Sequence, residues 1–386
     1  MKLDFIHNEN QMTIFLPEKV DTTNAQEVET AILSLLEGKH VSDLVLSCQK
    51  TSYISSIGLR MVMKLLRLYP KLSVKDCNPE VYEIFEMTGF VQMLPVSKAF
   101  REISIEGCPI IGNGAYGRVY RLDNETILKS YYRGNPISDI EREQTLAREA
   151  FILGVPTALS FDVVKVKEEG YGAVYELINS SSLLSCFQNH PDEYDHYLDL
   201  YVGLLDKLRH TSTEDAILPT TKEDDDLRLA SLEHALDEPL FAEIKARLDS
   251  MSQPNLLVHG DCHFKNVFVG DGELILIDMD TLSRGNPLLE LANLHRTYVA
   301  FEEVDPGNLE KFLGVSAQFA KKLYDDLLLR LYPDEKQRRI TGEQIRFLSY
   351  FLLLSHYVKH LDQKRALFEK TKDLLLSLLP KLEPFE

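Results

Sequence analysis

Short strand-like runs of apolar residues alternate with helix-like runs along the first hundred positions of the chain. The strand-like runs lie at residues 12–17, 43–47 and 72–76. There are three helix-like runs: one follows the cap-forming residues 21–24, one begins at Ser55-Ser56, and one begins at Asn78-Pro79. Strands that alternate with helices pack those helices on a sheet, so the pattern predicts a small α/β domain over residues 1–100.

Helical periodicity dominates the later part of the chain, over residues 194–209, 239–251 and most of 317–379. Strand-like runs precede this helical part, between about residues 101 and 180. Two further runs, 267–269 and 274–277, flank Gly270-Asp271-Gly272 and predict a β-hairpin. The second part of the chain is therefore expected to combine sheet and helix.

Length and charge narrow the classes of function. A chain of 386 residues is too long for one core, so two or three domains are expected. The net charge of −18 argues against a nucleic-acid partner, because a phosphate backbone would repel the protein. No apolar run reaches the roughly 18 residues of a membrane span, and the N-terminus lacks a signal-peptide pattern. We expect a cytoplasmic protein with no membrane partner.

The five cysteines are far apart, odd in number and without metal-ligand spacing. They are expected to be buried free thiols in a reducing cytoplasm. Cys262, beside Asp261, is a conceivable nucleophile, but the residues around it explain this segment without it.

Three oxygen-bearing side chains stand at strand ends in the middle of the second part. Asp261 and Asn266 lie five positions apart in His259-Gly260-Asp261-Cys262-His263-Phe264-Lys265-Asn266, and Asp278 ends the run that follows. Phosphoryl transfer needs such a set: one carboxylate to orient the attacking hydroxyl and two oxygens to hold Mg²⁺. His259 and His263 raise the alternative of a zinc site, but oxygen ligands suit magnesium better.

Upstream residues complete a nucleotide-binding pattern. Gly112, Gly114 and Gly117 form a glycine-rich turn that can approach phosphates closely. Lys129 lies on the next strand, and Glu143 lies in the helix after it. Each alone has an ordinary interpretation, Lys129 as a solvated strand-end lysine and Glu143 as a charge on a helix face. In this order they indicate a kinase fold, in which a strand lysine pairs with a helix glutamate.

Residues from about 108 to 386 resemble the aminoglycoside phosphotransferase and choline-kinase-like family, through the segments 259–266 and Ile277-Asp278-Met279-Asp280. The resemblance implies a two-lobed kinase-like fold, with an N-lobe over 101–180 and a helical C-lobe over 181–386. It also implies ATP and Mg²⁺ as cofactors and a small hydroxylated molecule as substrate.

The same resemblance assigns roles to single residues. It makes Asp261 the catalytic base or orienting group, and it makes Asn266 and Asp278 the magnesium ligands. Lys129 would contact phosphates and Glu143 would hold Lys129, while the backbone of residues 175–178 would meet adenine.

Three departures accompany the resemblance. Gly260 stands where protein kinases carry arginine, so activation-loop control is not expected. Met279-Asp280 replaces Phe-Gly after Asp278, as in small-molecule kinases. Glu290 replaces an aspartate of the family and is interpreted as structural.

Residues 1–100 resemble STAS domains, the anti-sigma-factor antagonists, through the segments 54–59, 78–80 and 87–90. In that family a partner kinase phosphorylates a serine at the start of the second helix, and the matching position here is Ser56. Ser55 stands where the family usually has an aspartate. The alternative interpretation makes Ser55 or Ser56 a helix N-cap.

The sequence thus predicts an α/β STAS-like domain followed by an α+β kinase-like part. The leading hypothesis is an ATP-dependent phosphotransferase that acts on a small-molecule hydroxyl and is gated by the STAS-like domain. The alternative is a regulatory protein that binds a partner protein through residues 1–100 and senses nucleotide with the kinase-like part. The acidic run 223–226 is compatible with a cationic acceptor, and equally with a solvated face.

Overall fold

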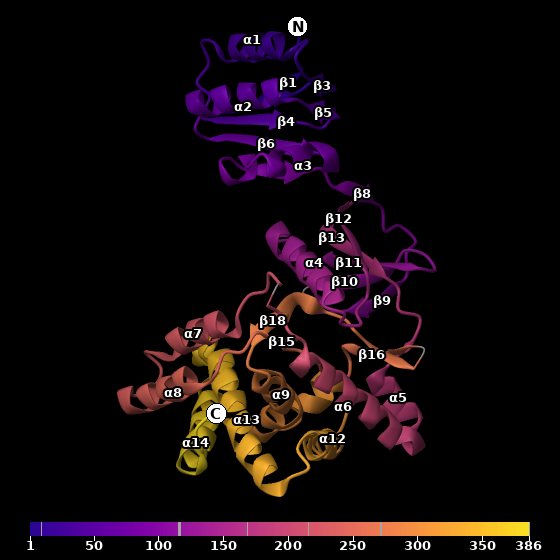
Figure 1. Ribbon diagram of the computed structural model, residues 1–386, viewed down its shortest axis with the longest axis vertical. Coiled ribbons are helices and arrows are strands. Elements are labelled where there is room, and N and C mark those ends of the chain that lie inside the picture. The colour runs from indigo at the N-terminus through magenta and orange to yellow at the C-terminus, as the bar shows by residue number, and fades with distance from the viewer. Residues whose placement is uncertain (9, 115–116, 168, 215, 271, 386) are drawn as a thin grey trace. The chain divides into compact units, whose positions relative to one another are not determined.

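A five-stranded sheet forms the centre of the first of two units into which the computed structural model divides, Met1–Ile103 and Ser104–Glu386 (Figure 1). The structure describes residues 1–8, 10–114, 117–167, 169–214, 216–270 and 272–385. Ala115 and Tyr116 of the predicted glycine-rich turn, and Asp271 of the predicted hairpin turn, lie outside the described residues.

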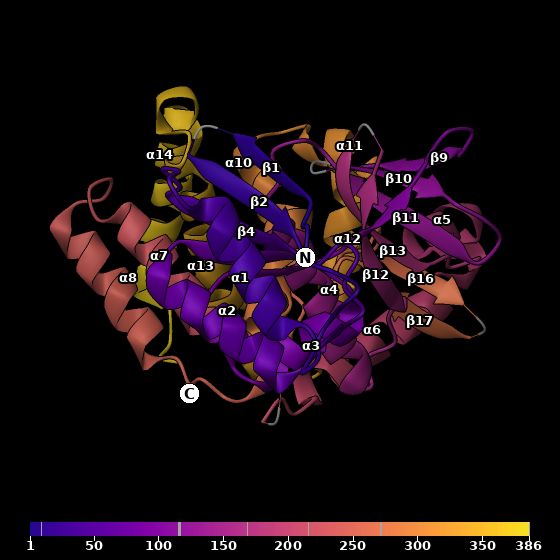
Figure 2. The same cartoon turned by 90° about the horizontal axis from the view of Figure 1, so that it is seen from above.

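In the first unit the strand order is β1-β2-β4-β6-β7, with β1 antiparallel to β2 and the other neighbours parallel. Helices α1 and α2 lie side by side (Figure 2). The strands are β1 (Phe5–Asn8), β2 (Gln11–Phe15), β3 (Lys19–Val20), β4 (Asp43–Ser47), β5 (Tyr53–Ile54), β6 (Leu72–Cys77), β7 (Val96–Lys98) and β8 (Arg101–Ile103). The helices are α1 (Ala25–Leu36), α2 (Ser56–Leu68), α3 (Pro79–Met87) and the 3-10 turn η1 (Phe90–Gln92).

Local sequence explains where these helices begin and which face they bury. Asn78 caps α3 by accepting from the Val81 N–H at 2.8 Å, and Pro79 takes the first helical position, as the sequence predicts. In α1 the apolar stripe contains the buried side chains of Val28 and Ile32. The prediction of a small α/β domain is confirmed.

The second unit begins with an antiparallel sheet in which β9 to β13 have the order β12-β13-β11-β10-β9. Helix α4 packs against β12 and β13 (Figure 1). These elements are β9 (Ile110–Asn113), β10 (Gly117–Arg121), β11 (Thr126–Tyr131), α4 (Ile137–Ile152), β12 (Ser160–Val166) and β13 (Gly170–Glu176).

The remainder of the second unit is mainly helical, with the long helix α13 packed against α7, α9 and α14. The helices are α5 (Leu183–Asn189), α6 (Tyr194–His210), α7 (Thr221–Leu232), α8 (Glu238–Ser250), α9 (Leu288–His295), α10 (Phe301–Val304), α11 (Asn308–Leu313), α12 (Ala317–Leu331), α13 (Glu335–Val358) and α14 (Leu361–Leu378). The strands and short turns are β14 (Ser181–Ser182), η2 (Pro191–Glu193), β15 (Leu256–Val258), β16 (Val267–Gly270), β17 (Glu273–Leu276), η3 (Met279–Thr281), β18 (Ser283–Gly285), the π-helical turn η4 (Arg296–Ala300) and η5 (Leu379–Lys381).

The predicted helical stretch 317–379 contains three helices. The first break falls at Pro333, which cannot continue α12, and Asp334 then caps α13 by accepting from the Gln337 N–H at 2.8 Å. The predicted hairpin is present as the antiparallel pair β16 and β17. Within the described ranges, no helix combines the length and apolar character that crossing a bilayer requires.

All five cysteines are free thiols. Four of them are buried, as the sequence predicts, whereas Cys108 is partly exposed. Cys262 is fully buried, and burial raises the pKa of its thiol well above the usual value. Such a thiol is a poor nucleophile, which supports the interpretation that Cys262 is a packing residue.

Candidate active site

The loop between β15 and β16 is held by a carboxylate from α9. Glu290 Oε2 accepts hydrogen bonds from the backbone N–H groups of His259 at 2.6 Å and Gly260 at 2.9 Å. Gly260 has a φ of 84°, a conformation that glycine adopts without strain. Glu290 therefore has the structural role that the sequence predicts, and the backbone itself requires glycine at position 260.

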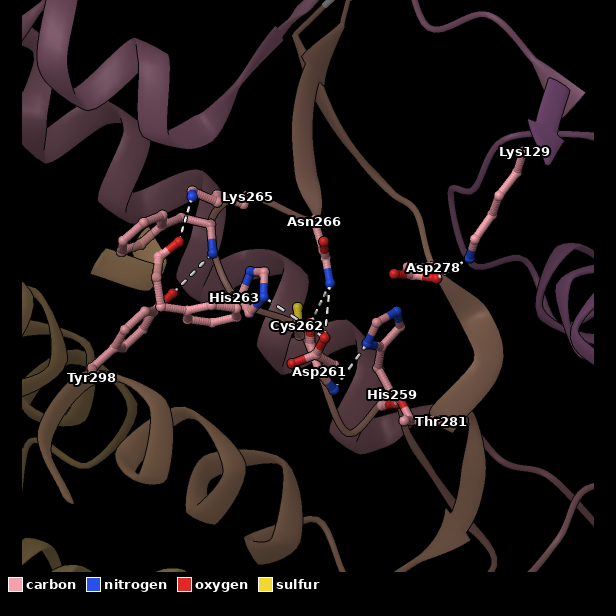
Figure 3. Close-up of polar contacts among 12 residues, drawn as sticks. Lys129, His259, Asp261, Cys262, His263, Lys265, Asn266, Asp278, Thr281 and Tyr298 are labelled. Atoms are coloured by element: carbon pink, nitrogen blue, oxygen red, sulfur yellow. Dashed lines mark hydrogen bonds and ion pairs between the residues drawn. The ribbon is translucent and has the colours of Figure 1, made fainter. Parts of the chain in front are cut away.

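His259 supports the same loop from within. Its side chain is fully buried, its Nδ1 accepts from the Asp261 N–H at 3.2 Å, and its carbonyl accepts from the Thr281 hydroxyl at 2.7 Å. Burial lowers the pKa of the His259 imidazole, which favours the neutral ring that can accept this bond. The two contacts fix the loop between its flanking segments (Figure 3).

Asp261 and Asn266 lie in contact in this loop. Asn266 Nδ2 donates to the Asp261 carbonyl at 3.0 Å and to Asp261 Oδ2 at 3.1 Å. Burial raises the pKa of Asp261 to about 6, the positive charge of Arg296 opposes this rise, and Asp278 adds to it. A carboxylate with a pKa near neutrality suits a group that takes a proton during a reaction.

Lys129 of β11 connects the sheet to Asp278, which lies after the hairpin of β16 and β17. Its Nζ lies 2.7 Å from Glu143 Oε1 and 2.7 Å from Asp278 Oδ1. Figure 3 shows the Lys129 side chain directed toward Asp278. The Lys129 side chain is only 19% exposed, so it is not the solvated strand-end lysine of the ordinary interpretation. Its two carboxylate partners raise its pKa against the effect of burial.

Two tyrosine hydroxyls, whose role the sequence did not predict, hold the helix partner of this lysine. Tyr131 donates to Glu143 Oε2 at 2.5 Å, and Tyr175 donates to Glu143 Oε1 at 3.3 Å. Tyr131 lies two positions after Lys129 on β11 and therefore shares its face of the strand. The period-two pattern of the strand could have identified it.

Asp278 has a φ of 68° and a ψ of 71°, which is unusual for a residue other than glycine. Strain of this kind persists where the surroundings fix it, and it is common at functional sites. Neighbouring Asp280 has its pKa raised to about 7, by burial first and then by Asp278. Several carboxylates thus share this region, and a cation would relieve their mutual repulsion.

The oxygen donors present fit magnesium. Lys129 binds Asp278 Oδ1 and Asn266 donates through Nδ2, while no hydrogen bond to a described residue engages Asp278 Oδ2 or Asn266 Oδ1. In the part of the chain that the structure describes, no three His, Cys, Asp or Glu side chains form a metal-binding group. A magnesium ion here would therefore complete its shell with water and ligand oxygens, as this ion commonly does.

A largely apolar cavity of about 280 Å³ lies beside these charged groups. Lys129, Glu143 and Asp278 line it together with Gly112 and the predicted hinge residues 175–178. Its other lining residues are Ile111, Val119, Ile127, Ala147, Thr157, Ala158, Phe268, Ile277 and Met279. An apolar cavity with charged groups at its border matches the two ends of a nucleotide.

Gly114 and Gly117 are not among the lining residues of this cavity. Gly117 instead lies against β11, and a Cβ there would meet the Ser130 carbonyl oxygen at 2.0 Å. Its lack of a side chain serves the approach of two strands. The Gly114 N–H donates to the Gly117 carbonyl at 2.9 Å and helps to close the turn.

Ser56 lies in the other unit, as the first residue of α2, and is exposed. The N-cap of this helix is Ser55, whose hydroxyl accepts from the Gly58 N–H at 3.5 Å. Of the two serines that the cap interpretation allowed, Ser55 is therefore the cap.

Comparison with known proteins gives two family matches and several more distant similarities. The model of the phosphotransferase enzyme family (APH) matches residues 107–313, and the STAS domain model matches residues 2–103. A curated protein of Bordetella bronchiseptica, BtrV, named as a candidate anti-sigma factor antagonist, is 29% identical over 103 residues, which are 26% of this chain and 88% of that protein.

Among solved structures, a thermostable mutant of aminoglycoside phosphotransferase APH(4)-Ia is 13% identical, with a TM-score of 0.48 over 72% of this chain and 97% of that chain. A choline/ethanolamine kinase family protein from Mesorhizobium loti is 15% identical, with a TM-score of 0.47 over 70% of this chain and 87% of that chain.

The contact at Gly117 generates a test of the sheet beside the cavity. Gly117→Ala is expected to lower the free energy of unfolding of the second unit by about 1–3 kcal/mol, because the new methyl group meets a backbone oxygen that cannot move alone. Gly114→Ala is the matched control, since its Cβ would meet its nearest neighbour at an ordinary 3.8 Å. Denaturant unfolding of both variants measures the difference. Equal stability of the two would contradict the packing described at Gly117.

Proposed function

The chain belongs to the phosphotransferase enzyme family through residues 107–313 and carries a STAS domain over residues 2–103, and from this premise we propose that it transfers the terminal phosphoryl group of ATP to the hydroxyl of a small molecule. The observation that carries the proposal is the double ion pair of Lys129, at 2.7 Å to Glu143 and 2.7 Å to Asp278, beside the apolar cavity. The pair with the helix carboxylate is the contact that positions a phosphate-binding lysine, and the contact with Asp278 brings this lysine next to the predicted magnesium ligand.

In this proposal ATP occupies the apolar cavity. The base lies against the apolar lining and the backbone of residues 175–178, with the phosphates at Lys129. Glu143, held by two tyrosine hydroxyls, keeps Lys129 in place. Gly112, Gly114 and Gly117 give a turn whose backbone can cover the phosphates. We divide this part of the chain into an N-lobe that ends near residue 180 and a helical C-lobe, which remains a prediction.

Asn266 and Asp278 would hold Mg²⁺ through their side-chain oxygens. When bound, the ion supplies positive charge to the phosphate oxygens during transfer. Lys129 and the ion would share the carboxylate of Asp278. One of its oxygens binds the lysine, and the other is left for the ion. The raised pKa of Asp280 is the expected property of a carboxyl that a bound cation would ionise.

Asp261 is the group that meets the acceptor. Its carboxylate would orient the attacking hydroxyl and take up its proton, for which the raised pKa of about 6 is suitable. Glu290 and His259 act as positioning residues, because they fix the backbone that carries Asp261. Gly260 in place of an arginine supports a small-molecule acceptor, since that arginine serves phosphorylation-dependent control in protein kinases.

A second role is favoured by the STAS domain. We propose that residues 1–100 bind a regulatory protein and that phosphorylation of Ser56 controls this binding or gates the phosphotransferase. The exposed position of Ser56 at the start of α2 supports the proposal, because a partner kinase could reach its hydroxyl. We also propose the cytoplasm as the place of action, because free thiols persist in a reducing compartment.

The phosphotransferase proposal is tested by Asp261→Asn. ADP release with a panel of hydroxylated metabolites is expected to fall by a factor of about 10³ or more in this variant, because positioning and electrostatics provide most of the rate of phosphoryl transfer. ATP binding, followed by calorimetry, should persist. Asp192→Asn, at an exposed aspartate, is the matched control and should retain activity.

The pH dependence of kcat/KM belongs to the same test. The pKa of Asp261 is raised above its usual value, so the carboxylate form is lost as pH falls through about 6, and activity should fall with it. Turnover by Asp261→Asn at the rate of the parent protein would rule out this assignment.

Ser56→Asp tests the regulatory role. The added charge imitates a phosphate at the start of α2 and is expected to change the amount of partner captured by the full chain from its native cells by about tenfold. Ser34→Asp, at an exposed serine of α1, is the control and should leave capture unchanged. Identical capture by the two variants would speak against a switch at Ser56.

A further inference from the structure

The π-helical turn η4 packs directly against the loop between β15 and β16, which carries Asp261. The Phe264 N–H donates to the Tyr298 hydroxyl at 2.9 Å, and the two rings stack with centroids 5.0 Å apart. Single π-helical turns are rare and often occur at functional sites. Arg296 opens this turn, two positions before Tyr298. Its guanidinium is thus carried on the element that fixes the loop of Asp261.

The guanidinium of Arg296 lacks a hydrogen-bond or ion-pair partner among the described residues, and its Nε is buried. Burial lowers the pKa of Arg296 to about 10, and its charge acts on Asp261. A buried donor without a partner costs free energy, which an anion bound to the guanidinium would offset. The Arg296 side chain is only partly buried, so the rest of its guanidinium can be reached by a ligand.

A second arginine, Arg228, lies on α7. The charges of Arg228 and Arg296 act on one another, and the charge of Arg296 also acts on His356 of α13. Arg228 is neutralised by Asp225 at 2.9 Å and Asp224 at 3.7 Å, whereas no described carboxylate forms an ion pair with Arg296. The positive charge that remains beside Asp261 is therefore that of Arg296.

The acidic run 223–226 does not provide a free site for a cationic acceptor. All four carboxylates have partners close by in the chain: Glu223 with the Thr220 N–H at 3.2 Å, Asp224 and Asp225 with Arg228, and Asp226 with Lys222. Asp225 is also buried, which corrects the interpretation of the run as a wholly solvated face. Thr220 caps α7, and Glu223 of the run completes its capping box.

We propose that Arg296 binds an anionic group of the acceptor, a phosphate or a carboxylate, while a hydroxyl of the same molecule lies at Asp261. The planar guanidinium offers two parallel donors that match both of these groups. This inference rests on the proposed phosphotransferase function and names its substrate class: hydroxy acids or sugar phosphates, in place of amino sugars or choline.

The transfer step itself is unchanged by this substrate class. The acceptor oxygen forms a bond to the γ-phosphorus as the bond from that phosphorus to the bridging oxygen of ADP breaks, and the hydroxyl proton passes to the Asp261 carboxylate. The net charge of −18 repels an anionic acceptor at long range. Arg296 acts at contact distance, where salt screens a partly buried charge much less.

Anion binding can be measured without turnover. The full chain, with and without saturating AMP-PNP and Mg²⁺, is titrated with inorganic phosphate and, separately, with malonate. Wild type is expected to bind at least one of them, and Arg296→Gln to bind it about tenfold more weakly, because a charge-assisted hydrogen bond is lost. Arg296→Lys keeps the charge and should lose less. Arg365→Gln, at an exposed arginine of α14, is the control and should match wild type.

The two titrations separate the two sources of the anion, since phosphate and malonate report on sugar phosphates and hydroxy acids respectively. AMP-PNP binding by Arg296→Gln shows that this variant is folded. Equal anion affinity of wild type and Arg296→Gln, or no binding of either anion by wild type, would overturn the inference.

A turnover panel then distinguishes this inference from the proposed function. With glycerate, glucose 6-phosphate, glycerol, choline and kanamycin as acceptors, ADP release is expected only with the anionic members, and KM for these should rise about tenfold in Arg296→Gln. Turnover of choline or kanamycin as fast as the anionic acceptors would overturn the inference and leave the phosphotransferase proposal standing. If wild type does not bind nucleotide, the phosphotransferase proposal is wrong. The anion titrations would still test Arg296 in that case.

Discussion

The bridge formed by Lys129 connects the sheet of the second unit to the loop after β17. Its ammonium group holds a carboxylate of α4 on one side and a strained aspartate on the other. The Glu143 side chain is buried and would be costly to bury without the lysine, whereas the Asp278 side chain is 38% exposed. Because Glu143 also accepts two tyrosine hydroxyls, the lysine is fixed before any ligand arrives. This arrangement gives a preorganised cation at the border of an apolar cavity.

Burial and neighbouring charges shift the pKa values of the carboxyl groups around that cation. Asp261 and Asp280 have raised pKa values because both are buried near Asp278, and the positive charge of Arg296 limits the rise at Asp261. A nucleotide with its metal ion would shift this balance toward the ionised forms, while the group nearest the acceptor keeps a pKa suited to proton transfer. The electrostatic design therefore separates a side that binds metal and phosphate from a side that handles a proton.

The sequence predicted the parts of this site that are carried by short-range patterns. Asp261 and Asn266 are five positions apart in one loop, and Asp278 ends the adjoining hairpin, so their proximity follows from local chain geometry. Lys129 and Glu143 were found through their order along the chain. The α/β pattern of the first unit was equally local, because period-two and helical runs are read from neighbouring residues.

The parts that could not be predicted depend on tertiary contacts. Nothing in the segment around Arg296 indicates that a π-helical turn would place its guanidinium near a loop more than thirty positions earlier. The close approach of the neighbouring strand, which also requires glycine at position 117, is a tertiary contact that the sequence does not show. The acidic run was ambiguous until Arg228 was seen to neutralise two of its members.

The central claim is that Lys129, held by Glu143 and Asp278, positions the phosphates of a nucleotide. Calorimetric titration of ATP and Mg²⁺ into the full chain and into Lys129→Met tests it most directly. The account predicts one binding site per chain and an affinity at least about tenfold lower in the variant, because the ionic contact to the phosphates is lost. An unchanged affinity in Lys129→Met, with the variant folded, would contradict it.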